Sequence, residues 1–553
     1  MRTSKTIDGL KVNAIAGTYV VTLGFDLPKS KCDGLLGFSI LRTDETGRAK
    51  FLEGMKCFAE TDPGFPAGAL YPSNEQPIQI FQWADYSAEP GKTYSYKVSA
   101  LKGSPAALTS FAECSVEVTT ESPEGGDQDI YFNRGTAASQ EYVRRFGNRA
   151  PDKVPGNKAF DWLSRGLYEA LAKFIVTCEA GTHKLRIAAY ELNYEPLLQL
   201  IEDTIHSGVD IQIVYDAKKD VPGNKNRELV EKYHLDNVST PRTTYASGIS
   251  HNKFIVKLEG DEPIAVWTGG TNFSDGGIFG HSNVAHVVED TDIAKLFMHY
   301  WEALQQDLDH KELPKATEAI SSIPLLDLPA GTSALFSPRK SLDALAYYCD
   351  LALKAKDGLF MTFAFGMNKT FKDVYTNSTA GFRLALLEKK TRPYKKEQEA
   401  AKLADEQEIQ DLRNMPENIF AIGNFIRTNE FDGWLKERLT GLNSNVNYVH
   451  NKFMLIDPLS DDPIVIGGSA NFSDASTIKN DENMLLVRGN TRVADIYLGE
   501  FMRLFSHFSF RESLQWRDVN DPPKPLRTDK WWESSFGDTP NSAKRKYFAQ
   551  VDI

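Results

Sequence analysis

The chain has 553 residues, of which 41% are hydrophobic and 25% charged, and its formal net charge is −12. This composition is typical of a globular protein with three or four domains, and the acidic balance argues against a general polyanion binder, which would carry a basic face. Five scattered cysteines without a CxxC pair predict neither a zinc site nor a disulfide framework. Since no signal peptide and no apolar membrane-spanning run is evident, we expect a cytoplasmic protein with reduced thiols, although export without a signal stays open.

Residues 1–120 contain short runs of β-branched and aromatic residues between turn residues, which predict strands at 18–25, 35–43, 77–85, 93–101 and 112–120. The segment from Pro90 to Val98 resembles the turn and strand of a fibronectin type III or immunoglobulin-like sandwich, in which a tyrosine, here Tyr94, caps the corner between the sheets. The resemblance implies a rigid sandwich that spaces domains or docks a protein partner. The polar segment 121–129 is predicted to be a linker.

From about residue 160 the pattern becomes α/β. Helical spacing alternates with strand-like runs, which predicts helices at 166–180, 195–208 and 341–356 and strands at 184–192, 209–216, 358–365 and 418–425. Residues 386–413 are predicted to form a highly charged helix on a solvated surface insertion. Four arginines leave two interpretations open, a solvated surface or a phosphate-facing cluster: Arg134, Arg144, Arg145 and Arg149.

Two segments about 200 residues apart match each other. Each opens with His-Asn-Lys-Phe, at His251 and at His450, and continues through a predicted strand, a turn and a second strand to a Gly-Gly loop. Asn272 lies 21 residues after the first histidine, and Asn471 lies 21 residues after the second. Because chance does not readily produce two motifs with the same internal spacing, the sequence predicts a duplicated α/β unit.

The repeated residues suit a phosphodiester. Positions i and i+2 of a strand share a face, so each histidine projects with the lysine that follows it, Lys253 or Lys452. Lysines and asparagine amides neutralise non-bridging oxygens, while one histidine attacks phosphorus and the other protonates the leaving oxygen. This chemistry needs no metal and no cofactor, and no metal-ligand spacing is evident. A purely structural role for two buried lysines would be costly.

His450, Lys452 and Asp457, followed by Ser469 and Asn471, resemble the HKD motif of the phospholipase D superfamily. The resemblance covers about residues 130–515. It implies two duplicated α/β half-domains, 130–322 and 323–515, around a pseudo-twofold axis, and a phosphohistidine intermediate. The remaining residues, 516–553, are predicted to form a tail that packs on the core.

The first half departs from the motif. Leu258 stands where the motif has aspartate, and Gly269 and Gly270 stand where it has Gly-Ser. A further difference lies downstream: Glu482 follows His450 by 32 residues, whereas the same spacing from the first histidine leads to Asn283. The first half thus has an amide where the second has an acid.

In the family the orienting side chains resemble a crossed pair, in which the acid of one half holds the histidine of the other half. This implies that Glu482 holds His251 as the nucleophile and that Asn283 faces His450 as the general acid. The tyrosyl-DNA phosphodiesterase branch is similar in lacking the motif aspartate, so Leu258 is compatible with activity. A decayed, inactive first site stays open as an alternative.

Three substrate interpretations remain. The run from Asn480 to Asn483 resembles the nuclease branch, whereas many lipid enzymes carry Asp-Arg-Ser in this loop, so a nuclease comes first. A phospholipase D comes second, and a non-catalytic binding protein third. The acidic total argues against the first, and the lack of a membrane-binding amphipathic helix against the second. Four aromatic residues of the tail either contact substrate or, as we expect, pack on the core: Trp516, Trp531, Trp532 and Tyr547.

Overall fold

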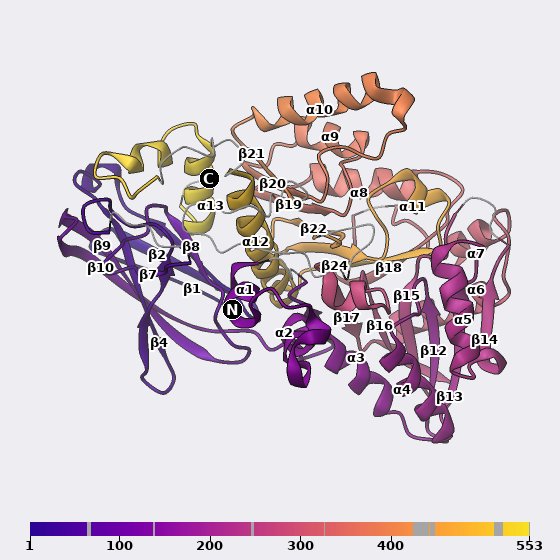
Figure 1. The fold of residues 1–553 in the computed structure, drawn as a ribbon. Helices are drawn as coiled ribbons and strands as arrows, with labels where there is room; N and C mark the ends of the chain where they lie inside the picture. Colours follow the sequence, from indigo (N-terminus) through magenta and orange to yellow (C-terminus); the bar gives the residue numbers. More distant parts are fainter. Residues whose placement is uncertain are drawn as a thin grey trace.

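The computed structural model describes residues 1–62, 68–135, 139–244, 248–325, 327–423, 442, 448–513 and 524–551. An all-β region comes first, and two α/β halves with the same strand order follow it (Figure 1). The predicted fold class is therefore confirmed.

The N-terminal region consists of two four-stranded antiparallel sheets. One contains β1 (Arg2–Ile7), β2 (Leu10–Ala16), β3 (Val21–Asp26) and β8 (Gln82–Asp85), and the other contains β10 (Ala107–Thr119), β9 (Thr93–Ser104), β4 (Gly37–Asp44) and β5 (Ala49–Phe51). Two short strands pair beside them, β6 (Glu53–Gly54) and β7 (Tyr71–Pro72). The hydroxyl of Tyr94 accepts a hydrogen bond from the Glu89 N–H at 3.0 Å, as the corner tyrosine of a sandwich would. The fibronectin type III assignment itself stays a prediction.

The first half has a seven-stranded mixed sheet. Its strands, in order, are β11 (Gln128–Phe132), β17 (Val284–Val288), β16 (Glu262–Gly269), β15 (Lys253–Glu259), β12 (His183–Ala189), β13 (Asp210–Asp216) and β14 (Ser239–Arg242). Ile187 and Ile255 face one helix layer, whereas Ala188 and Phe254 face the other, as the two-residue period of a strand requires. The helices are α1 (Gln140–Phe146), α2 (Lys158–Ser164), α3 (Leu167–Val176), α4 (Glu195–His206), α5 (Val221–Lys232), α6 (Thr291–Gln305) and α7 (Leu313–Ile320).

The second half repeats this sheet strand for strand. The order is β18 (Gly331–Ser337), β24 (Glu482–Arg488), β23 (Ile464–Gly468), β22 (Phe453–Ile456), β19 (Gly358–Phe363), β20 (Phe382–Leu387) and β21 (Asn418–Ile422). Its helices are α8 (Asp343–Leu353), α9 (Lys369–Asn377), α10 (Glu399–Arg413), α11 (Asp474–Ile478) and α12 (Thr491–Ser513). The long α12 lies between the sheets and the N-terminal region (Figure 1).

The C-terminal tail joins the N-terminal region to the second half. Trp531 and Trp532 are buried in the core of the N-terminal sheets, and the Trp531 indole donates to the Leu35 carbonyl at 2.7 Å. Helix α13 (Pro540–Ala549) packs against β3, and its Tyr547 is buried against Phe360 of β19. Trp516 lies outside the described residues. The described tail aromatics thus pack on the core.

Three details differ from the sequence predictions. Residues 386–413 are not one helix, because Leu386 and Leu387 end the buried parallel strand β20 and α10 begins only at Glu399, beyond Pro393. Strand β11 begins at Gln128, inside the predicted linker 121–129, because its edge pairs with β17. Strands β1 and β2 were also not predicted; β1 is polar and half-exposed, whereas β2 is mostly buried. The described part of the predicted strand 418–425 is β21.

Candidate active site

The two halves exchange backbone hydrogen bonds where their sheets meet. The His251 N–H donates to the Asp481 carbonyl at 3.0 Å, and the His450 N–H donates to the Ser282 carbonyl at 3.2 Å. Both histidines are buried, and each comes just before a central strand of its sheet, β15 or β22. The main chain at each histidine is therefore held by the opposite half.

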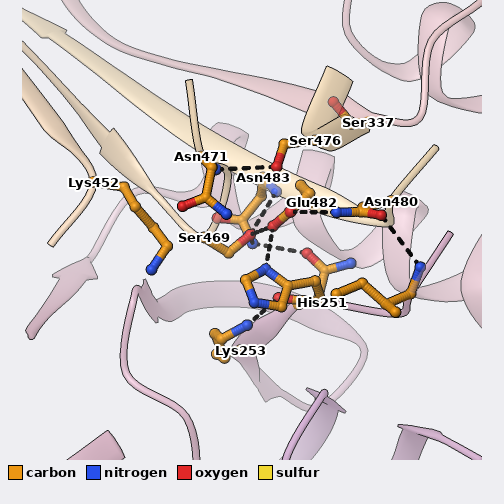
Figure 2. A network of polar contacts seen from close by, with 12 residues as sticks. His251, Lys253, Ser337, Lys452, Ser469, Asn471, Ser476, Asn480, Glu482 and Asn483 are labelled. Atoms are coloured by element: carbon orange, nitrogen blue, oxygen red, sulfur yellow. Dashed lines mark hydrogen bonds and ion pairs between the residues drawn. The ribbon is translucent and has the colours of Figure 1, made fainter. Parts of the chain in front are cut away.

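A carboxylate of the second half binds the histidine of the first. Nδ1 of His251 lies 2.8 Å from Glu482 Oε2, which also accepts from the Ser469 hydroxyl at 2.8 Å, while Asn480 donates to Oε1 at 3.2 Å (Figure 2). Burial would raise the pKa of Glu482, but His251, Lys253 and Ser469 lower it below its usual value. The acid is thus held ionised, and it fixes the proton of His251 on Nδ1.

An amide of the first half binds the histidine of the second. Nδ1 of His450 lies 2.9 Å from Asn283 Oδ1, so the crossed arrangement has an acid on one side and an amide on the other. Burial lowers the pKa of His251 to about 4 despite Glu482. Burial, with Lys452 and His281, lowers the pKa of His450 well below its usual value. Both histidines are neutral in the free protein near pH 7.

Two buried lysines accompany the histidines. Nζ of Lys253 donates to the His251 carbonyl, and Nζ of Lys452 donates to the His450 carbonyl at 2.6 Å. Burial lowers the pKa of Lys253 to about 7 and that of Lys452 well below its usual value, with the neighbouring charge of Lys253 adding to the second shift. An anion bound between the two amines would raise both lysine pKa values again, so the site is suited to bind a negatively charged group.

The two motif asparagines lie on the loops that follow β16 and β23. Asn272 and Asn471 are both buried or nearly so, and among the described residues Oδ1 of each has no hydrogen-bond partner. Figure 2 shows Asn471 among the site residues, with its backbone N–H donating to the Ser476 hydroxyl at 3.2 Å. An unpaired buried acceptor costs about 1–3 kcal/mol, so the amides are poorly satisfied by the protein alone.

The motif aspartate lies away from these groups. The Asp457 carboxylate accepts hydrogen bonds of 2.7–3.0 Å from the backbone N–H groups of Lys356, Asp357 and Gly358, which fixes the turn before β19. Its counterpart Leu258 packs in a hydrophobic cluster with α6. The missing aspartate of the first half therefore removes no group from the site.

Gly270, which occupies the position of Ser469 in the first half, has a steric reason. Ser469 donates to Glu482, whereas a Cβ at Gly270 would lie 3.2 Å from Oδ1 of Asn283. A side chain there would crowd the amide that binds His450.

Two rings missed by the sequence predictions cover the histidines. His281 lies against His450 with ring centroids 4.4 Å apart, and Tyr190 lies 4.8 Å from His251. The Tyr190 ring also faces Nζ of Lys253 at 5.0 Å. His281 sits 30 residues after His251, so alignment of the repeats beyond their motifs would have marked it opposite Asn480.

Two buried carboxylates were also missed. Asp216 ends β13 and accepts from the Ser250 N–H at 3.0 Å, and Glu388 follows β20 and accepts from the Val449 N–H at 2.9 Å. Each bond anchors the residue just before a site histidine. The sequence signal that could have revealed them is an acidic residue at the end of the equivalent strand in each half.

The four arginines do not join the site in the contacts described. Arg144 and Arg145 pair with Glu141, and the Arg134 guanidinium lies 4.6 Å from the Trp162 ring. Within the described ranges, no three histidine, cysteine, aspartate or glutamate side chains are grouped to hold a metal ion. Among the described helices, none is long and apolar enough to cross a membrane.

The model of a family described as cardiolipin synthase, PLD-like domain, matches residues 175–305 and 357–505, which is more than half of the chain. No curated protein matches the chain.

Among solved structures, phosphatidylserine synthase of Haemophilus influenzae is similar at 12% identity and a TM-score of 0.44, over 62% of this chain and 85% of that one. Polyphosphate kinase of Porphyromonas gingivalis is similar at 10% identity and 0.40, over 68% of this chain but only 50% of the kinase. Yeast tyrosyl-DNA phosphodiesterase is similar at 11% identity and 0.31, over 56% and 85%. Similarities of this size carry no information about substrate.

Proposed function

The chain belongs to the family of PLD-like domains whose model matches both of its halves, and from this premise we propose that it is a phosphodiesterase with His251 as nucleophile and His450 as general acid. The carrying observation is the crossed pair of hydrogen bonds in which Nδ1–H of His251 donates to Glu482 and Nδ1–H of His450 donates to Asn283. Because Nδ1 is occupied in both rings, Nε2 is the nitrogen left to react in each.

In the first step, Nε2 of His251 attacks phosphorus. The P–N bond forms as the bond to the leaving oxygen breaks, and that oxygen takes a proton from Nε2 of His450. Lys253, Lys452 and the amides of Asn272 and Asn471 bind the non-bridging oxygens. In the second step, His450 removes a proton from water, the water oxygen attacks phosphorus, and the P–N bond breaks.

The acid and the amide suit these different roles. A phosphorylated His251 that keeps its Nδ1 proton is a cation, and the ionised Glu482 stabilises it. Asn283 is neutral, so it holds the orientation of His450 without the charge that would make its proton harder to release. Binding of an anionic diester raises the pKa of His450, which lets the ring carry a proton when it is needed.

We propose a nucleic acid as the substrate ahead of a phospholipid. The run from Asn480 to Asn483 resembles the nuclease branch, and the partly exposed Tyr190 ring offers a base a stacking face beside His251. The phospholipid alternative is supported by the family description, which refers to a lipid enzyme. Non-catalytic binding is the third candidate.

The first experiment incubates the full chain with plasmid DNA and single-stranded DNA in excess EDTA, beside His450→Ala. Degradation that survives EDTA and is lost in the variant supports the nuclease. If DNA stays intact, head-group release from mixed phospholipid micelles tests the alternative. Full activity in His251→Ala together with loss in His450→Ala would overturn the role assignment, and inactivity on both substrates would favour binding alone.

A further inference from the structure

His281 precedes β17 in the first half and is buried against the opposite half. Its ring centroid lies 4.4 Å from that of His450, with the ring planes inclined by 38°. The loop that carries it is clamped by Asn133, whose amide donates to the carbonyls of Ile278 at 2.8 Å and His281 at 3.0 Å. Asn133 Oδ1 also accepts from the Asn283 N–H at 2.8 Å. The main chain at His281 is therefore tightly held.

The amide of Asn283 has both of its hydrogens directed at acceptors. Nδ2 donates to the Gly277 carbonyl at 2.7 Å and lies 3.0 Å from Nδ1 of His281. An amide nitrogen can only donate, so this nitrogen of His281 is the acceptor and its ring proton is on Nε2. A flipped amide would place Oδ1 against the Gly277 oxygen and leave Nδ1 of His281 without a donor. The two acceptors together point Oδ1 of Asn283 at His450.

The repeat supplies an independent check. Asn480, the counterpart of His281 in the second half, donates to Oε1 of Glu482 at 3.2 Å. In each half, the residue two positions before the orienting group binds that group. The ionised Glu482 can only accept hydrogen bonds, and its neighbour Asn480 donates one to it. Asn283 directs an amide hydrogen at its neighbour His281, which accepts it. The change from His281 in the first half to Asn480 in the second thus matches the change from Asn283 to Glu482.

We propose that His281 is a positioning residue that holds His450 in the tautomer with its proton on Nδ1, by accepting a hydrogen bond from Asn283. This inference rests on the proposed role of His450 as the proton-transferring group. In this arrangement, Nε2 of His450 faces substrate as an acceptor in the neutral ring, and it donates only after taking up a proton. Burial lowers the pKa of His281 to about 3, so the ring stays neutral and keeps its acceptor.

The test compares two substitutions that differ in hydrogen bonding. His281→Phe keeps a ring over His450 and removes the acceptor, whereas His281→Asn places an oxygen close to the position of Nδ1. We expect His281→Phe to lower kcat about 10-fold with KM unchanged within about twofold, and His281→Asn to recover most of kcat. Equal damage in both variants, or full activity in His281→Phe, would overturn the proposal.

Two further readouts separate positioning from simple loss of structure. The loss in His281→Phe should be larger for a diester with an alkoxide leaving group than for one with p-nitrophenolate, which needs no acid. The ¹⁵N shifts of the His450 ring, assigned with His450→Gln, should report a proton on Nδ1 in the parent chain and a mixture of tautomers in His281→Phe. Because the shifts do not depend on turnover, an unchanged tautomer overturns this inference even if the proposed activity stands. Equal activity in His450→Gln and the parent chain would instead overturn the proposed function.

Discussion

The two α/β halves share a scaffold and differ in the side chains that they place at the candidate site. Both sheets have the same strand order, and each supplies a histidine, a lysine and an asparagine at the same spacing. Yet Glu482 of the second half corresponds to Asn283 of the first, and Asn480 corresponds to His281. Symmetry brings two similar sets of groups to one place, and in the proposed mechanism the departures from it allow two chemically equivalent rings to take different roles.

The largest expected effect comes from removing either histidine. His251→Ala should lower kcat roughly 10⁴-fold or more and form no phosphoenzyme, because no nucleophile remains. His450→Ala should lower kcat about 10²- to 10⁴-fold. With a p-nitrophenyl diester this variant should nevertheless accumulate a phosphoenzyme, because p-nitrophenolate leaves without a general acid whereas the attacking water has no general base. Intact-protein mass spectrometry after rapid acid quench measures the adduct. The reverse pattern of adducts would exchange the two roles.

Exchanging the orienting groups tests the asymmetry directly. Glu482→Gln removes the charge that stabilises phosphorylated His251, so kcat should fall about 10²- to 10⁴-fold. Asn283→Asp adds a charge beside His450 and should raise its pKa, so the limb of the kcat–pH profile that requires neutral His450 moves to higher pH. Profiles measured from pH 5 to 9 check both changes. Asn283→Ser serves as the uncharged control, and an equal shift in that control would contradict the electrostatic reason.

Binding of a diester should be coupled to proton uptake. The pKa of Lys253 is lowered to about 7 in the free protein, so this amine is mostly neutral at pH 8 and becomes charged beside an anion. At pH 6 Lys253 already carries its proton, so its share of the uptake should be smaller, whereas His450 can still take up a proton. Calorimetric titration of a non-hydrolysable diester in two buffers of different ionisation enthalpy measures the uptake. Lys253→Met should reduce the uptake more at pH 8 than at pH 6, and an equal reduction at both pH values would count against the prediction.

The smallest effect on activity is expected at the motif aspartate. Asp457→Ala leaves the backbone N–H groups of Lys356, Asp357 and Gly358 without their acceptor, so the free energy of unfolding should fall by about 1–2 kcal/mol. Because Asp457 contacts none of the site groups described, kcat of the folded variant should stay within about twofold. Denaturant unfolding and turnover at low temperature measure the two quantities, and Asp457→Asn provides a partial acceptor as the matched control. A large loss of kcat with normal stability would assign it a direct role.

Local sequence patterns determined much of the fold. Strands such as β12 and β19 and helix α4 follow from the spacing of apolar residues, which acts over a few positions. The duplicated motifs predicted His251 and His450, and the equal 32-residue spacings identified Glu482 and Asn283 as counterparts. That each would bind the histidine of the other half was implied by the family resemblance. The predictions were wrong where a buried parallel strand, β20, ran into charged residues and resembled one helix with them.

Contacts between the halves were decided only by the tertiary structure. His281 and Tyr190 have ordinary sequence surroundings, and their rings meet the histidines because loops from different strands converge at the sheet junction. Asn283 and His450 are 167 residues apart, and the hydrogen bond between them depends on how the two halves dock. The placement of Asp457 has the same origin, since a carboxylate that could bind a ligand instead binds the backbone of a neighbouring turn. Periodicity fixes which face of a strand a side chain occupies, but only packing decides what lies opposite that face.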